Sequence, residues 1–242
     1  MSENLSTEQV KDKHVRSLPG DVGPLYHALY NSLTAAYLSW ILFKDLFAKS
    51  KERVDLLNRT AGTFFLVIQE TLRRDVLLAI ARITDSVVTG RTQENATIET
   101  LVNDLRAHVE EDFGKELSAK ALDIALMCKP IRAHRNKTLA HSDKRFAIGG
   151  PDALVLPGVT VANVDAALEA IADVLNRVSR RFDLGTTFFE DVIHAGGARS
   201  LMVHLRSAEV FHDACQRSKK EPNRSAEIFQ DACQCSKKER LD

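Results

Sequence analysis

Apolar residues recur every three or four positions through long parts of the sequence, and this spacing constrains the fold more than any other feature. Between residues 51 and 85 they form one continuous stripe, and a second stripe runs from Val161 to Phe182. This period matches the 3.6-residue turn of an α-helix, so both segments are predicted to be long amphipathic helices. Thr160 is the predicted N-cap of the second helix.

Further helices complete the prediction. They are expected from Pro24 to about Ser50, shortly after Asn95, from about residue 115 to 142, and after Gly196-Gly197. Five or six helices with modest connections predict an all-α protein, an antiparallel four- to five-helix bundle. The sequence contains neither a G-x-G-x-x-G fingerprint nor a Walker loop, so the dinucleotide and nucleoside-triphosphate enzymes built on those motifs lose support.

Changes in composition divide the chain into three predicted parts. Residues 1–23 are polar and are interrupted by glycines, which is typical of a mobile arm. Residues 24–205 form the predicted helical domain. Residues 206–242 form a tail that repeats itself.

The tail contains a tandem duplication. The segment Arg206–Glu221 recurs as Arg224–Glu239 with 13 of 16 positions identical, and Pro222 between the copies argues against one unbroken helix. We interpret the tail as a partly ordered appendage. A metal site from four tail residues is less favoured, because Cys-x-Cys lacks the two-residue gap of zinc knuckles; those residues are His212, Cys215, Cys233 and Cys235. No metal or cofactor is therefore predicted.

The overall charge and the cysteine content indicate a compartment and a mode of binding. Lys and Arg together number 33, as do Asp and Glu, so affinity for nucleic acid requires a local patch. The four cysteines do not form a secretory disulfide pattern. The N-terminal residues lack a signal-peptide core, and no apolar run is long enough to span a membrane, so a cytoplasmic protein without membrane contact is expected.

A local cationic patch lies between residues 129 and 145. It contains two histidines and six Lys or Arg residues against one acid, Asp143. The basic side chains are candidates for following the phosphates of RNA, although cations at a helix end also complement the helix dipole and promote solubility. The predicted RNA-contacting residues are Lys129, Arg132, His134, Lys137, Lys144 and Arg145.

Arg135 is less easily explained as a surface residue. It follows Cys128 and Ile131 on the apolar stripe of the predicted helix, so it points toward the interior or a groove. An arginine there needs a partner. The sequence leaves two alternatives open: an ion pair with an acid such as Asp85 or Asp75, or a cleft in which Arg135 binds an anion.

His141 lies six residues after Arg135. Histidine exchanges a proton near neutral pH, and arginine is a fixed cation that suits phosphate oxygens. A phosphodiester that is cleaved by its own 2′-hydroxyl needs both roles and no metal. Spacing alone is weak support for this chemistry, because a structural histidine at a helix end is more common.

The segment Arg135-Asn-Lys-Thr-Leu-Ala-His141 resembles the R-x(4–6)-H signature of HEPN domains. The similarity extends to the abortive-infection, AbiU-like branch, through Glu52–Gln69, the R-x-T-D motif at Arg82–Asp85, and R-N-K-x-x-A-H-x-D at Arg135–Asp143. It covers residues 24 to about 205 and leaves out the duplicated tail.

This resemblance implies a HEPN bundle that forms a homodimer with its motif helices facing each other. It implies a metal-independent endoribonuclease of toxin–antitoxin or phage-defence type, with RNA and an antitoxin protein as partners. Carried over to this sequence, Arg135 and His141 form the catalytic pair and Asn136 supports them.

Two other interpretations remain open. One is a non-catalytic HEPN module that binds RNA, nucleotide or a partner protein, which the overall neutrality of the chain favours slightly. The other is a plain helical scaffold, in which Arg135 pairs internally with an acid and its replacement destabilises the fold.

Overall fold

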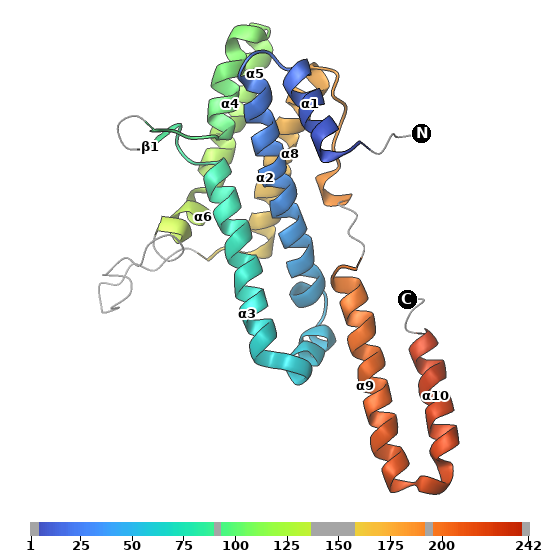
Figure 1. Ribbon diagram of the computed structural model, residues 1–242. Coiled ribbons are helices and arrows are strands. Elements are labelled where there is room, and N and C mark those ends of the chain that lie inside the picture. The colour runs from blue at the N-terminus through green and yellow to red at the C-terminus, as the bar shows by residue number, and fades with distance from the viewer. Residues whose placement is uncertain (1–4, 90–92, 137–157, 192–195, 239–242) are drawn as a thin grey trace, which may run out of the picture. The chain divides into compact units, whose positions relative to one another are not determined.

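The computed structural model describes residues 5–89, 93–136, 158–191 and 196–238 (Figure 1). The chain divides into two compact units. The first consists of Met1–Ser39 and Arg73–Val192, and the second of Trp40–Leu72 and Ile193–Asp242. The helices α2 (Val22–Phe43) and α3 (Lys51–Ile83) each contribute to both units.

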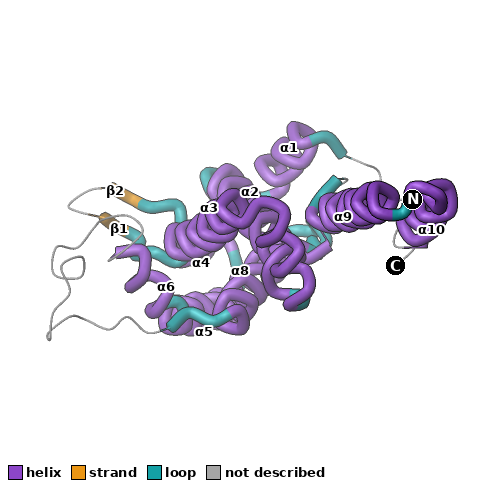
Figure 2. Tube along the Cα trace, turned by 90° about the horizontal axis from the view of Figure 1, so that it is seen from below, coloured by secondary structure: helices purple, strands orange, loops and turns teal. Residues whose placement is uncertain are grey.

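The first unit is a helical bundle, as predicted. The start of α2, the end of α3, α4 (Ile98–Leu105), α5 (Glu111–Met127) and α8 (Val161–Arg181) surround its core (Figure 1; Figure 2). The only described strands are the two-residue segments β1 (Val88–Thr89) and β2 (Gln93–Glu94), which pair antiparallel. Each helix contributes fully buried side chains, among them Leu33, Ile80, Leu101, Leu117 and Ile171. No helix in the described ranges is both long and apolar enough to cross a membrane.

Helix α8 begins and ends as the sequence predicts. The hydroxyl of Thr160 accepts a hydrogen bond from the backbone N–H of Asn163 (3.2 Å), and the Asn163 side chain accepts one from the N–H of Thr160 (3.0 Å). This reciprocal capping box satisfies two backbone donors that the first helical turn leaves open. The predicted apolar stripe is buried at Val164, Leu168, Ile171, Leu175 and Val178.

The prediction of a single helix from about residue 115 to 142 is wrong, because the structure has two helices in this segment. Helix α5 ends at Met127, Cys128 has non-helical backbone angles (φ −84°, ψ 2°), and a separate α6 spans Lys129–His134. Pro130 has no N–H to donate, and inside a continuous helix its ring would clash with the carbonyl group four residues earlier. Residues 137–157 lie outside the described residues.

The sequence also failed to predict a helix in residues 1–23, where we expected a mobile arm. Helix α1 spans Thr7–Ser17. The Ser6 hydroxyl accepts the N–H of Gln9 (3.3 Å), and the Gln9 side chain accepts the N–H of Ser6 (2.7 Å). The helix is mostly polar, so it lacks the apolar stripe that reveals the others.

Close contact with the start of α2 holds α1 in place. A Cβ atom at Gly23 would lie 2.8 Å from the Cα of Val15, so only glycine allows the two backbones to approach this closely. The adjacent His14 is buried, and its Nδ1 lies 3.1 Å from Nδ1 of His27. The Asn31 side-chain amide lies 3.0 Å from the other ring nitrogen of His27.

The second unit combines the first part of α3 with α9 (Ala198–Lys220). A π-helical turn at Lys44–Ala48 precedes α3, which is kinked at Ala61 (φ −160°, ψ 65°). The apolar cluster of this unit is formed by Leu46, Leu56, Leu57, Phe65, Ala198 and Met202.

The duplicated tail forms a helical hairpin. Its first copy lies in α9 and its second in α10 (Ser225–Lys238), and the predicted break at Pro222 is confirmed by a 3₁₀ turn at Pro222–Arg224. The equivalent residues Ala214 and Ala232 are both buried. The predicted boundary after residue 205 falls within α9. Among the described side chains, no three His, Cys, Asp or Glu residues lie together as metal ligands would.

Candidate functional site

The C-terminal end of α3 carries a buried hydroxyl followed by a half-buried carboxylate. The Thr84 hydroxyl donates to the carbonyl oxygen of Ile80 (2.8 Å). Asp85 follows directly, and its Oδ1 accepts the backbone N–H of Ser86 (3.1 Å). A carboxylate at this end of a helix is repelled by the negative end of the helix dipole, so it requires a cation.

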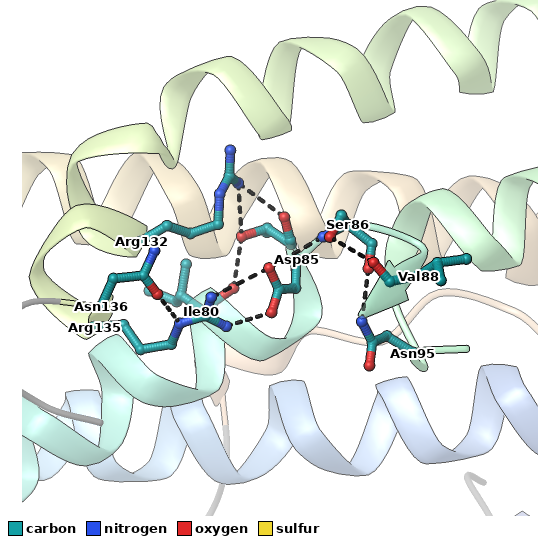
Figure 3. A network of polar contacts seen from close by, with 9 residues as sticks. Ile80, Asp85, Ser86, Val88, Asn95, Arg132, Arg135 and Asn136 are labelled. Carbon is teal, nitrogen blue, oxygen red and sulfur yellow. Dashed lines mark hydrogen bonds and ion pairs between the residues drawn. The ribbon is translucent and has the colours of Figure 1, made fainter. Parts of the chain in front are cut away.

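The chain after Asp85 is held by a second set of hydrogen bonds. The Asn95 side chain donates to the carbonyl oxygen of Ser86 (2.8 Å), and the Asn95 backbone donates to that of Val87 (2.8 Å). The Ser86 hydroxyl donates to the carbonyl oxygen of Val88 (3.2 Å). Figure 3 shows Ser86, Val88 and Asn95 grouped on one side of Asp85, so the turn leading into β1 fixes the carboxylate.

Arg132 attaches α6 to the end of α3. Its Nη1 donates to the carbonyl oxygen of Thr84 (2.8 Å) and to its hydroxyl (3.3 Å), and its Nη2 donates to the carbonyl oxygen of Ala125 (2.6 Å). Two of these acceptors are backbone carbonyls near helix ends, which have no partner within their own helix. Arg132 therefore joins α3, α5 and α6.

Cys128 lies at the break between α5 and α6 and is completely buried. Burial raises the pKa of its thiol, and a hydrogen bond with Thr84 and the charge of Arg132 only partly oppose this. A thiol that stays protonated is a poor nucleophile, so Cys128 acts in packing.

Arg135 pairs with Asp85 across these helices. Its Nη1 donates to Asp85 Oδ2 in a short ion pair, and its Nη2 donates to Asp85 Oδ1 (3.3 Å). Its Nε donates to the side-chain oxygen of Asn136 (2.9 Å). In Figure 3 the guanidinium group of Arg135 points at the carboxylate of Asp85, with Asn136 beside it.

The pair lies at the edge of the unit and is not sealed inside it. The side chains of Arg135 and Asp85 are 19% and 22% exposed, and Asn136 is exposed. Three of the five N–H groups of Arg135 are used by Asp85 and Asn136. Within the described residues the remaining two have no acceptor, so they can donate to an anion that approaches from solvent.

A family model described as AbiU2, of HEPN type, matches residues 20–195. The chain belongs to the AbiU2 family of HEPN proteins. The match confirms the resemblance seen in the sequence and the all-α bundle that it implies, and it associates the HEPN domain with abortive infection. No curated protein and no solved structure matches the chain.

The structure brings together two of the motifs that carry the AbiU2 resemblance. Arg135 and Asp85 lie 50 residues apart in the sequence, at the start of the R-N-K-x-x-A-H motif and at the end of R-x-T-D. Of the two acids considered as partners, Asp85 forms the pair, whereas Asp75 accepts a hydrogen bond from the Ser39 hydroxyl (2.7 Å).

The other predicted site residues of the AbiU2 domain divide into two groups. Lys129 is exposed at the start of α6, His134 is half-buried at its end, and Arg132 binds the carbonyl groups described above. Their RNA contacts stay predictions. Four further candidates lie outside the described residues, namely Lys137, His141, Lys144 and Arg145.

Sequence reasoning missed the residues that support this corner of the AbiU2 domain. Ser86 and Asn95 carry no periodic or motif signal, because they act through backbone groups in a turn. Thr84 was visible only as part of the R-x-T-D motif, which gives no hint that Arg132 binds it.

Proposed function

We propose that this HEPN domain is a metal-independent endoribonuclease of the toxin–antitoxin or phage-defence type. The observation that carries the proposal is the position of Arg135. It starts the R-N-K-T-L-A-H segment, it is held by Asp85, and it stays partly exposed at the edge of the unit. A cation fixed in this way can stabilise developing negative charge without reorganising during the reaction.

The proposed reaction is an internal transesterification of RNA. The 2′-oxygen loses its proton and attacks the adjacent phosphorus, the bond from phosphorus to the 5′-oxygen breaks, and the leaving oxygen gains a proton. His141 either accepts the first proton or donates the second, and Arg135 stabilises the pentacoordinate phosphate. The products are a 2′,3′-cyclic phosphate and a 5′-hydroxyl. In a homodimer each motif occurs twice, so the RNA groove is composite.

A non-catalytic HEPN module that binds RNA, nucleotide or a partner protein is the second candidate. The observation that favours it is the same ion pair, because Asp85 balances the charge of Arg135. The plain scaffold interpretation also requires an internal acid beside Arg135. His141 therefore distinguishes the candidates better than Arg135, since the loss of Arg135 leaves a half-buried carboxylate unpaired and weakens the fold in every case.

Incubation of the purified protein with total RNA in the presence of a chelator tests the proposal. We expect cleavage by the wild type and a loss of at least about 100-fold in His141→Ala. The matched control is His212→Gln, which gives the first tail copy the residue that the second copy carries at Gln230. Equal cleavage by His141→Ala and His212→Gln would exclude the proposed mechanism, and no cleavage by the wild type would leave the non-catalytic binding module.

A further inference from the structure

The guanidinium group of Arg135 has two edges that can each hold a pair of oxygen atoms. One edge is formed by Nη1 and Nη2 and the other by Nε and Nη2. Asp85 occupies the first edge with both carboxylate oxygens, and Asn136 accepts only the Nε hydrogen of the second. The second hydrogen on Nη2, which no described residue accepts, lies parallel to the Nε–H, so a phosphate can take the second edge if Asn136 moves away.

The two neighbours of Arg135 differ in how firmly they are held. The Asp85 carboxylate also accepts the Ser86 N–H, and Asn95 in turn holds the Ser86 carbonyl group. Displacing Asp85 would leave a half-buried charge unpaired at the C-terminal end of α3. Asn136 is neutral and exposed, so water replaces its bond to Arg135 at little cost.

We propose that Asp85 is the positioning residue of Arg135, and that a phosphate of RNA binds the Nε and Nη2 edge by displacing the Asn136 side chain. Asp85 stays bound throughout and fixes the plane of the guanidinium group. The Asn136 oxygen occupies the place of one phosphate oxygen until substrate arrives. This inference rests on the proposed function, since it takes RNA as the ligand of Arg135.

Nitrogen-15 NMR of the arginine side chains in the full-length protein tests which edge the phosphate uses. The probe is a 2′-O-methyl oligoribonucleotide, which lacks the attacking hydroxyl and therefore stays intact. We expect the Nε–H resonance of Arg135, assigned by its loss in Arg135→Lys, to shift during the titration. The Nη resonances should stay separate, because the ion pair with Asp85 slows rotation of the group.

Two results of the titration would overturn the inference. Merging of the Nη resonances on addition of the oligonucleotide would mean that Asp85 is displaced. An unshifted Nε–H, with or without binding elsewhere, would mean that this edge takes no phosphate. Because the probe is not cleaved, the titration decides the inference even if the wild type proves inactive on RNA and the proposed function fails.

The kinetic constants kcat and KM distinguish a positioning role of Asp85 from a purely structural role. Asp85→Asn keeps the shape but loses the charge, and we expect kcat to fall by about 100-fold with a much smaller rise in KM. Asp85→Glu, which restores the charge, should recover at least about tenfold of that loss. Wild-type kcat in folded Asp85→Asn would overturn the positioning role. If Asp85→Asn does not fold, the kcat of Asp85→Glu and the NMR titration decide whether Asp85 positions Arg135.

Discussion

Two helix junctions in the first unit are held by polar side chains of opposite character. Helix α1 meets α2 through His14 and His27, which are 7% and 8% exposed. Helix α6 meets α3 through the charged pair of Arg135 and Asp85, with Arg132 beside it. The first junction requires neutral rings, because two protonated imidazoles would present hydrogens to each other. The second requires charge, so pH and salt should act on different junctions.

The hydrogen bonds of the histidine junction fix its protonation. The Asn31 amide donates to Nε2 of His27, so His27 carries its proton on Nδ1 and donates it to Nδ1 of His14. Burial, together with smaller contributions from the charges of His27 and Lys13, lowers the pKa of His14 to about 4. Burial, with a contribution from Lys11, also lowers the pKa of His27.

The largest effect is expected at the charged junction. Arg132→Ala removes the donors that satisfy the carbonyl groups of Thr84 and Ala125, and we expect the free energy of unfolding to fall by about 3 kcal/mol. Urea unfolding followed by circular dichroism measures this. The matched control is the exposed Arg180→Ala. Equal stability of the two variants would show that Arg132 is not an anchor.

Acid should weaken the histidine junction. Because the pKa of His14 is lowered in the folded state, the unfolded chain binds more protons between pH 6.5 and 4. The contribution of His14 to the free energy of unfolding is therefore complete above pH 6.5. It is lost as the pH falls, and we expect the loss to reach about 2 kcal/mol at pH 4.5. This loss is measured as the free energy of unfolding across this pH range in the wild type and in His14→Gln. Identical slopes in the two proteins would contradict the assignment.

The close approach of α1 to α2 gives a third, smaller effect. Gly23→Ala places a Cβ against the backbone of Val15, and we expect a loss of about 1.5 kcal/mol, with faster amide exchange in α1. Gly62→Ala is the control, because nothing lies within 4 Å of its added atom. That variant should be unchanged or slightly more stable. Protected α1 amides in Gly23→Ala would argue against tight docking.

The smallest effect is expected for the ion pair itself, and its dependence on salt distinguishes the charged junction from the histidine junction. A double-mutant cycle of Asp85→Asn and Arg135→Met should give a coupling energy of about 1 kcal/mol, since the pair is partly exposed. At about 1 M salt the coupling should decrease, because exposed charges are screened. The acid-induced loss assigned to His14 should change less. Coupling that is insensitive to salt would mean that the pair behaves as a buried one.

The sequence predicted the parts of the fold that depend on local pattern. The stripe from Val161 to Phe182 and the Thr160 cap set the bounds of α8, because periodicity and capping are properties of neighbouring residues. The division at Cys128 was missed because the apolar spacing continues across it, although Pro130 carried the signal. Helix α1 was missed because its attachment depends on Gly23 and on one buried histidine.

The candidate site could be predicted only in part. The motif identified Arg135 and Asn136, and the position of Arg135 indicated a partner, either an acid such as Asp85 or Asp75 or an external anion. Choosing among them depends on a contact across 50 residues, which spacing within one helix cannot reveal. His141 lies outside the described residues, so its pairing with Arg135 stays a prediction.

The interruption of the helix at Cys128, next to Pro130, makes α6 a short helix with its own contacts to the rest of the unit. The six residues of this helix are attached by the buried Ile131, by Arg132 and by the following Arg135, and not by continuation of the α5 backbone ladder. Substitutions on the part of α5 away from the Ala125 carbonyl group can thus adjust the stability of the scaffold without tilting the arginine. Conversely, small changes at Thr84 or Asp85 can re-aim that arginine while the scaffold stays intact, so the two properties are free to evolve separately.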